Sequence, residues 1–198
     1  MINILTSLPK TILSGTILLL IIMGVTNGVT DTIYFDYNYS TFFFRWLHVL
    51  SGTMWIGLLW YFNFVQIPSM PKIPDAQKPA IGKVIAPAAL FWFRWSALST
   101  LITGLILGYL NGYIHDALTL SNSDPKSLMI GIGMWLGTIM ALNVWGIIWP
   151  NQKRALGIIE VSPDAKAAAA KKAMIFSRIN TLLSIPMLYC MVAAQNLY

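Results

Sequence analysis

Five long apolar stretches constrain this chain more than any other feature of its sequence. They cover approximately residues 11–29, 42–66, 88–112, 127–149 and 173–196. Each is close to or longer than the roughly 18–20 residues that an α-helix needs to cross a bilayer. Helices satisfy their own backbone hydrogen bonds in lipid, whereas isolated strands do not. The sequence therefore predicts an all-α polytopic membrane protein, with five transmembrane helices in one bundle and residues 1–198 in a single domain.

The amino-acid composition supports the same fold class. Of the 198 residues, 57% are hydrophobic and only 10% are charged, whereas soluble domains carry roughly 25% charged residues. The eight Trp and eight Tyr are typical of the aromatic belts at membrane interfaces. The single cysteine, Cys190, excludes a disulfide framework and a Cys-based zinc or iron–sulfur site. We expect a lipid bilayer around the chain, namely the cytoplasmic (inner) membrane of a bacterium.

The chain has a net charge of +6, and the distribution of its basic residues between the loops predicts how the chain is oriented in the membrane. The loops after the second and fourth spans hold most of the basic residues, namely Lys72, Lys78, Lys83, Lys153, Arg154, Lys166, Lys171 and Lys172. The loops on the opposite side are mainly acidic, with Asp31, Asp36, Asp116 and Asp124. Because Lys and Arg are retained on the cytoplasmic side, we expect the amino terminus inside and the carboxyl terminus outside. The charge does not indicate a nucleic-acid partner.

The two basic loops have different local patterns. The segment from Pro68 to Pro74 contains three prolines, which predicts an extended, non-helical connection. Ser162, Pro163 and Asp164 have the pattern of an N-cap, a proline in the first turn and an acid in the first turn. The alanine-rich run that follows favours helix. The fifth helix is therefore predicted to begin in water near Pro163 and to continue into the membrane.

Glycines recur every four residues in two of the spans. Gly104, Gly108 and Gly112 share one face of the third span, and Gly133 and Gly137 share one face of the fourth. Small residues at this spacing let helices approach closely in lipid, so we interpret them as packing surfaces, within the bundle or in a homo-oligomer. A dinucleotide-binding loop is excluded because no strand is predicted before the glycines.

Polar side chains inside a span are costly and are therefore candidates for function. Arg45 lies near the outer end of the second span, Asn63 near its inner end, Arg94 in the third span and Arg178 in the fifth. The arginines can also extend to lipid phosphates from near the helix ends. Asn63, together with Gln66 and Asn143, could line a small cavity or form hydrogen bonds between helices.

His48 is the sharpest of these candidates. It lies about 9 Å into the second span at 1.5 Å per residue, with Gly52 one turn further along the same face. An imidazole can bind haem iron, and a glycine leaves room for the flat macrocycle. The alternative is a histidine that bonds to a neighbouring helix. A second axial ligand could come from His115 or from one of four methionines, Met54, Met134, Met187 and Met191.

Four segments carry a resemblance to a known family. The second span, from Arg45 to Gly57 (RWLHVLSGTMWIG) and on to Gln66, resembles the membrane domain of the urate hydroxylases. Three further stretches resemble the same domain: Phe91–Trp95 (FWFRW), Ile148–Gln152 (IWPNQ) and Ser177–Pro186 (SRIN to LSIP). The resemblance implies a membrane protein connected with urate oxidation, in which electrons pass to a cytochrome c domain fused at the carboxyl end.

The chain departs from this family pattern at three points. No cytochrome c domain follows the fifth span, so we expect a short form of the family. Ser96 stands where the resemblance leads us to expect an acid, and Ile179 where it leads us to expect a histidine. These departures leave three hypotheses open. The first is a redox protein that binds b-type haem and passes electrons to a separate cytochrome c. The second is a non-catalytic subunit of a larger respiratory or oxidising complex, and the third is a small transporter.

Overall fold

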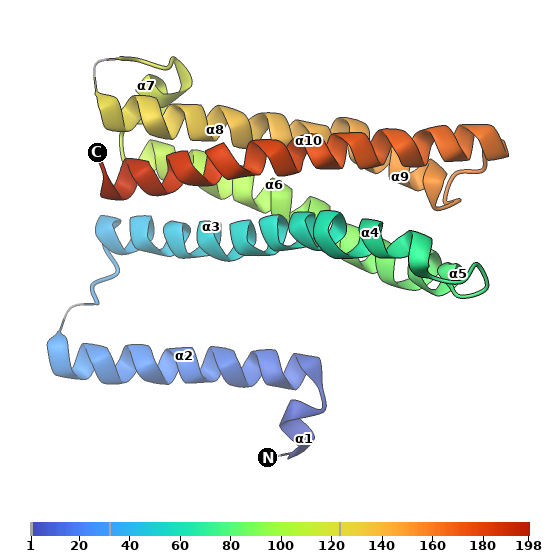
Figure 1. The fold of residues 1–198 in the computed structure, drawn as a ribbon. Helices are drawn as coiled ribbons and strands as arrows, with labels where there is room; N and C mark the ends of the chain where they lie inside the picture. The colour runs from blue at the N-terminus through green and yellow to red at the C-terminus, as the bar shows by residue number, and fades with distance from the viewer. Residues whose placement is uncertain (1, 32, 123) are drawn as a thin grey trace. The chain divides into compact units, whose positions relative to one another are not determined.

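The computed structural model describes residues 2–31, 33–122 and 124–198, and every regular element in them is helical (Figure 1). Five helical segments are long and apolar enough to cross a membrane: Leu8–Thr30, Tyr37–Lys72, Lys78–Leu110, Pro125–Ala155 and Pro163–Asn196. The predicted fold class is thus confirmed. The orientation of the two termini across the membrane stays a prediction.

Several of these segments change helix type along their length. In chain order the elements are α1 (Ile2–Leu5), α2 (Leu8–Thr30), α3 (Tyr37–Trp60), η1 (Tyr61–Gln66), α4 (Ile67–Ser69), η2 (Met70–Lys72), α5 (Lys78–Ala80), η3 (Ile81–Ile85), α6 (Ala86–Leu110), α7 (Ile114–Leu118), α8 (Pro125–Asn143), η4 (Val144–Ile148), α9 (Trp149–Ala155) and α10 (Pro163–Asn196). Among them η1, η3 and η4 are π-helical and η2 is a 3₁₀ turn.

The chain separates into two compact units, residues 1–42 and 43–198. The first unit contains α2, a helix of 23 residues in which no described side chain is buried. The second unit begins within α3 and contains both cavities described below. The predicted single transmembrane domain stays a prediction.

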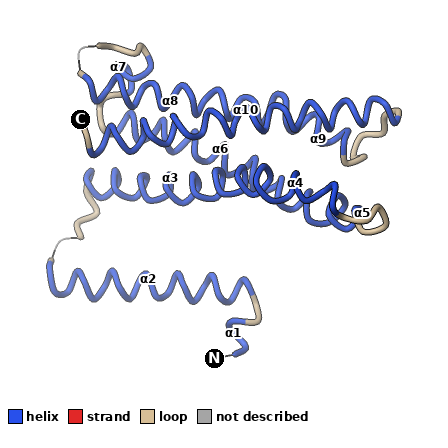
Figure 2. The backbone as a smooth tube through the Cα atoms, viewed as in Figure 1, coloured by secondary structure: helices blue, strands red, loops and turns tan. Residues whose placement is uncertain are grey.

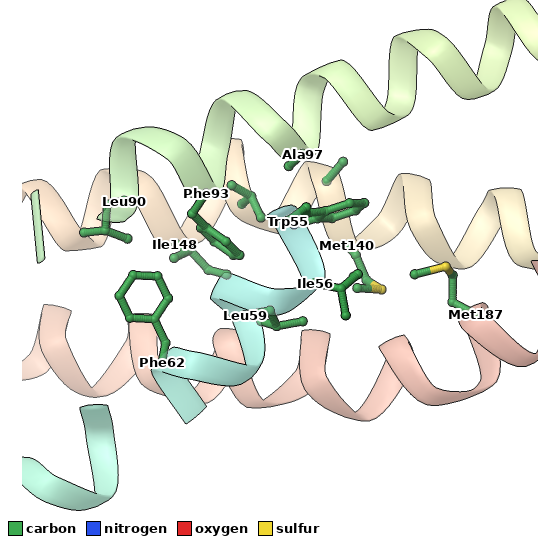
Figure 3. Close-up of a cluster of buried hydrophobic side chains, with 12 residues drawn as sticks. Trp55, Ile56, Leu59, Phe62, Leu90, Phe93, Ala97, Met140, Ile148 and Met187 are labelled. Carbon is green, nitrogen blue, oxygen red and sulfur yellow. The ribbon is translucent and has the colours of Figure 1, made fainter. Parts of the chain in front are cut away.

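Within the second unit, helices far apart in sequence share one apolar core. Trp55, Ile56 and Leu59 of α3 pack among side chains of α6, α8 and α10 (Figure 3). The rings of Phe62 and Phe93 meet edge to face, with centroids 5.7 Å apart. In this unit α7, the start of α8 and the carboxyl terminus lie at one end of the bundle. The short helices α5 and α9 lie at the other end (Figure 1), and loops join the long helices at both ends (Figure 2).

The predicted extended connection at Pro68–Pro74 is wrong for most of its length. Ile67–Ser69 is α-helical, Met70–Lys72 is a 3₁₀ turn, and the chain first becomes extended at Ile73. Pro68 follows a π-helical segment in which the Ile67 N–H bonds back five residues to the Phe62 carbonyl. A proline ring in an α-helix clashes with the carbonyl four residues earlier, and a π turn widens the backbone at that point.

The same pairing of a π segment with a proline occurs three times. The segments η1, η3 and η4 end two residues before Pro68, Pro87 and Pro150 respectively. Each proline therefore stands in the first turn of the α-helix that follows, where a missing N–H costs least. The prolines interrupt the hydrogen-bond register without ending the long helices.

The early start of the fifth long helix is confirmed. α10 begins at Pro163, and the hydroxyl of Ser162 accepts a hydrogen bond from the Ala165 N–H at 3.3 Å. Asp164 lies in the first turn, where a negative charge complements the helix dipole. The helix thus begins ten residues before the apolar stretch that the sequence marks.

Candidate functional site

The larger cavity of the second unit lies between α3, α6, α8 and α10 and is called here the His48 cavity. Its volume is about 510 Å³. The lining is mostly apolar and includes His48, Gly52, Gly104, Met134, Met187 and Met191. Concave, largely apolar spaces with a few placed polar groups are the usual form of a cofactor site.

A hydrogen bond to α6 fixes the imidazole of His48. Its Nδ1 lies 3.1 Å from Thr103 Oγ1. When the Thr103 hydroxyl donates to the Ser99 carbonyl, 2.7 Å away, its oxygen is left to accept from the ring. In this arrangement the proton of neutral His48 is on Nδ1 and the lone pair is on Nε2. The backbone of Thr100 is a second hydrogen-bond partner of this side chain.

Glycines determine how closely α6 approaches this ring. A Cβ atom at Gly104 would lie 3.0 Å from His48 Cε1, closer than side chains normally pack. At Gly52 a Cβ would lie 3.8 Å from the Thr100 methyl group, and at Gly137 it would meet nothing within 4 Å. Gly104 is therefore required for contact with the imidazole, whereas Gly52 and Gly137 widen the cavity.

The other glycines of the predicted packing faces serve contacts away from His48. A Cβ at Gly133 would lie 3.1 Å from Cys190 Cβ, which reflects close packing of α8 on α10. A Cβ at Gly108 would lie 3.4 Å from Ile114 Cβ. Gly112 has a positive φ of 74°, a conformation that glycine adopts without strain, and it follows the end of α6.

The structure separates the candidate axial ligands. Met134, Met187 and Met191 line the His48 cavity together with His48. His115 lies in α7, and neither it nor Met54 is among the residues that line the cavity. The pairing of His48 with His115 stays a prediction, and the cavity offers thioether sulfurs instead. Its lining also holds one unpaired polar atom, the buried Nε1 of Trp55.

A polar contact between Arg45 and Asn111 lies one turn from His48, toward the start of α3 and at the carboxyl end of α6. Arg45 is exposed, and its Nη2 lies 3.5 Å from the Asn111 side-chain oxygen. Burial raises the pKa of the neighbouring Tyr113, and the positive charge of Arg45 acts in the opposite direction. Arg45 thus leaves a positive charge at this end of the bundle, with no carboxylate paired to it among the described residues.

A second cavity of about 240 Å³, called here the Gln66 cavity, lies among the three π segments. Its polar lining consists of Gln66, Gln152 and Ser177. Asn63 is not part of the lining, but its Nδ2 donates to Ser177 Oγ at 2.8 Å. The sequence left open whether Asn63, Gln66 and Asn143 line a cavity or bond across helices. Gln66 lines the cavity, whereas Asn63 and Asn143 bond to α10, and the sequence did not indicate Gln152 or Ser177.

The two arginines predicted inside spans lie outside both cavities. The guanidinium carbon of Arg94 lies 3.9 Å from the centroid of the Trp149 ring, a cation–π contact. Arg178 is exposed on α10. Neither arginine belongs to the lining of the His48 cavity or of the Gln66 cavity.

Comparison with known families concerns the carboxyl-terminal part of the chain. Residues 123–197 match the family described as urate oxidase N-terminal. The resemblance to the urate hydroxylase membrane domain is thereby confirmed. The matched residues include α8, α9 and α10, whereas His48 and Thr103 lie before them. No curated protein and no solved structure matches the chain.

The two positions that depart from the family pattern, Ser96 and Ile179, are both described in the structure. Ser96 is buried in α6, and its hydroxyl donates to the Trp92 carbonyl at 2.6 Å. Ile179 is 37% exposed on α10. A histidine at position 179 would therefore start from a partly exposed backbone position.

Sequence reasoning missed Thr103, the residue that orients His48. Threonine occurs at several positions in the third span, and nothing in the periodicity shows which of them faces a histidine on another helix. Its neighbour Gly104 was a usable signal, because a glycine marks a close approach of helices.

Proposed function

We propose that this protein is a membrane oxidoreductase of the urate hydroxylase type, in which the His48 cavity binds one b-type haem. One observation carries the proposal: the bond from His48 Nδ1 to Thr103 leaves the Nε2 lone pair available on a ring that borders the cavity. Histidines that bind metals characteristically donate their other ring N–H to a neighbouring group.

The side chains around the cavity have separate roles in this proposal. Thr103 keeps the imidazole in one tautomer and orientation, and Gly104, which has no side chain, provides the space that the ring occupies next to α6. Gly52 and Gly137 provide room for a flat macrocycle, and the apolar lining excludes water. Met134, Met187 and Met191 are the candidates for a second axial ligand. A bound haem supplies one-electron transfer, and histidine with methionine as axial ligands raises its reduction potential.

The position of His48 along the bundle supports exchange of electrons at one face. Its partner Thr103 lies seven residues before the end of α6, or about 10 Å at 1.5 Å per residue. The charge pattern places this end outside, so we propose a separate cytochrome c at the outer face of a bacterial inner membrane as the electron acceptor. Arg45 lies at the same end and can pair with haem propionates.

A second candidate function is that of a non-catalytic membrane subunit. The observation that favours it is α2, a helix of 23 residues with no described side chain buried. Within the first unit, the apolar surface of this helix is free to contact lipid, the second unit, another subunit of a respiratory or oxidising complex, or a second copy of the chain.

A difference spectrum separates these two functions. The full chain is produced in cells supplied with haem precursor, purified in detergent, and its reduced-minus-oxidised absorbance is recorded. We expect Soret and α bands that disappear in His48→Ala. The matched control is His115→Ala, which should keep both bands because His115 does not line the cavity. Colourless protein that is folded and pure contradicts the proposal. Loss of the bands in both variants contradicts methionine as the second ligand.

A further inference from the structure

A row of polar side chains on α10 connects the two cavities. Ser177, Asn180 and Ser184 lie on one face of the helix and are each at most 6% exposed. Ser177 lines the Gln66 cavity. Seven residues further along, or about 10 Å, Ser184 Oγ accepts a hydrogen bond from Trp60 Nε1 at 3.1 Å. Trp60 lines the His48 cavity, so the row spans the apolar core that separates the two spaces.

Each member of this row has a partner on another helix. Ser177 Oγ accepts from Asn63 Nδ2 at 2.8 Å, and Asn180 Oδ1 accepts from Asn143 Nδ2 at 2.9 Å. The Asn180 amide also donates to the Met140 carbonyl at 2.9 Å. Hydrogen bonds of this kind hold helices together in lipid. By themselves they would require no water.

Two buried acceptors next to the row are left without partners. They are Oδ1 of Asn63 and Oε1 of Gln66. Asn63 donates through Nδ2 both to Leu59 O and to Ser177 Oγ, so exchanging its amide atoms would cost the bond to the Leu59 carbonyl. An unpaired buried carbonyl oxygen costs about 1–3 kcal/mol. Interhelical contacts alone do not explain two such atoms one turn apart.

We propose that the Gln66 cavity is a water-filled entry from the end of the bundle that carries the basic loops. Ordered water molecules bind the polar lining of Gln66, Gln152 and Ser177, and through Ser177 they adjoin the polar row of α10. The cavity volume of about 240 Å³ far exceeds the roughly 30 Å³ that one water molecule occupies in the liquid. The row then places buried polar side chains between this water and the edge of the His48 cavity.

The lining favours water over other occupants. No charged side chain is among the residues that line the Gln66 cavity, so nothing there compensates the charge of an ion. Gln66, Gln152 and Ser177 provide both donors and acceptors, as a small cluster of water molecules requires. The lining also includes Gly82, where an added Cβ atom would meet nothing within 4 Å.

Cysteine accessibility tests this entry directly. In a Cys190→Ala background, single cysteines are introduced as Ser177→Cys and Ala173→Cys, and each protein is treated with a trimethylammonium-ethyl methanethiosulfonate. This charged reagent reacts with thiolates, which form in water. Ala173 is completely buried, lies one turn nearer the start of α10, and does not line the cavity. We expect Ser177→Cys to react at least about tenfold faster, by intact-protein mass. Equal rates, or a faster reaction at position 173, would overturn the proposal.

Narrowing the cavity at Gly82 gives a matched control. Adding Gly82→Phe to the Ser177→Cys protein should slow its modification, because the ring occupies space in the lining where an added Cβ atom displaces no neighbour. An unchanged rate would overturn the proposed route of entry.

A measurement on the unmodified chain covers the case in which a cysteine variant does not fold. Brief radiolysis in solution oxidises residues that adjoin bound water, and peptide mass spectrometry locates the oxidation. We expect oxidation at Met174, which lines the cavity, and none at the fully buried Met140. Equal oxidation at the two positions would overturn the proposal. None of these readouts requires haem, so their failure is distinct from failure of the proposed redox function.

Discussion

The two cavities of the second unit differ in what their polar atoms can bind. In the His48 cavity, the candidate ligand atom is the Nε2 of a ring that contacts Thr103 and Gly104, and Nε1 of Trp55 is unpaired. In the Gln66 cavity, the free polar atoms are amide oxygens next to a serine. The first arrangement suits a metal-containing cofactor and the second suits water. The same bundle therefore combines a dry, shaped site with a hydrated one.

The difference arises from the helices that form each cavity. Regular α-helical segments of α3 and α6 surround His48, so small residues at helical spacing determine the available space. π segments surround Gln66, and each accommodates a proline two residues later. Widened turns of this kind change the direction of side chains locally, which brings Gln66 and Asn63 into the interior with their amide oxygens unpaired.

The largest expected effect comes from filling the space beside the imidazole. Gly104→Leu should abolish haem binding, because a Cβ at this position already lies 3.0 Å from His48 Cε1. The measurement is the haem content of the purified protein. Gly82→Leu is the matched control, because it adds the same side chain at the Gln66 cavity and should leave haem content unchanged. Equal loss in the two variants would mean that the cavities are not independent.

Removing the acceptor for His48 should have a smaller effect. Thr103→Val keeps the shape of the side chain but leaves the Nδ1–H unpaired, and loss of such a supporting bond lowers metal affinity by about 10- to 100-fold. The affinity is measured by titrating haem into haem-free protein. Thr103→Ser restores the oxygen and should bind as the unmodified chain does. A normal affinity for the valine variant would remove Thr103 from the site.

The polar row of α10 should contribute to stability. Asn180→Leu leaves the Asn143 amide without its acceptor, at a cost of about 1–3 kcal/mol. Adding Asn143→Leu should recover part of this loss, because both partners are then apolar. Thermal unfolding in detergent measures the difference. A double variant less stable than Asn180→Leu alone would argue against pairing as the origin of the effect.

The smallest effect concerns neither cavity. The Ser127 hydroxyl, which donates to Asp124 at 2.8 Å, holds the pKa of this carboxyl below its ordinary value, and the Ser127 N–H adds to the shift. A lowered pKa stabilises the folded chain above the unfolded-state pKa of about 3.9, and this contribution is lost as the pH falls through the lower folded pKa. Between about pH 6 and pH 3, Tm should therefore decrease more for the unmodified chain than for Asp124→Asn, which caps without titrating. Equal decreases would contradict the assignment.

Hydropathy was sufficient to predict the five long helices, since each span must be apolar over its own length. It also identified His48 and Gly104, because a polar residue and a glycine stand out in such a helix. Thr103 could not be predicted, because its partner lies 55 positions away and depends on how two helices are rotated. Pro68 was misinterpreted for a related reason: a proline pattern does not show that the preceding turn is π-helical.

The haem content of the purified chain tests the central claim most directly. The protein is produced with ample haem precursor, and the pyridine haemochromogen is quantified against protein concentration for the unmodified chain and for His48→Ala. The proposed site predicts one haem b per chain, and none in the variant. Folded protein without haem, or a variant that retains the full haem content, would contradict His48 as the ligand that defines this site.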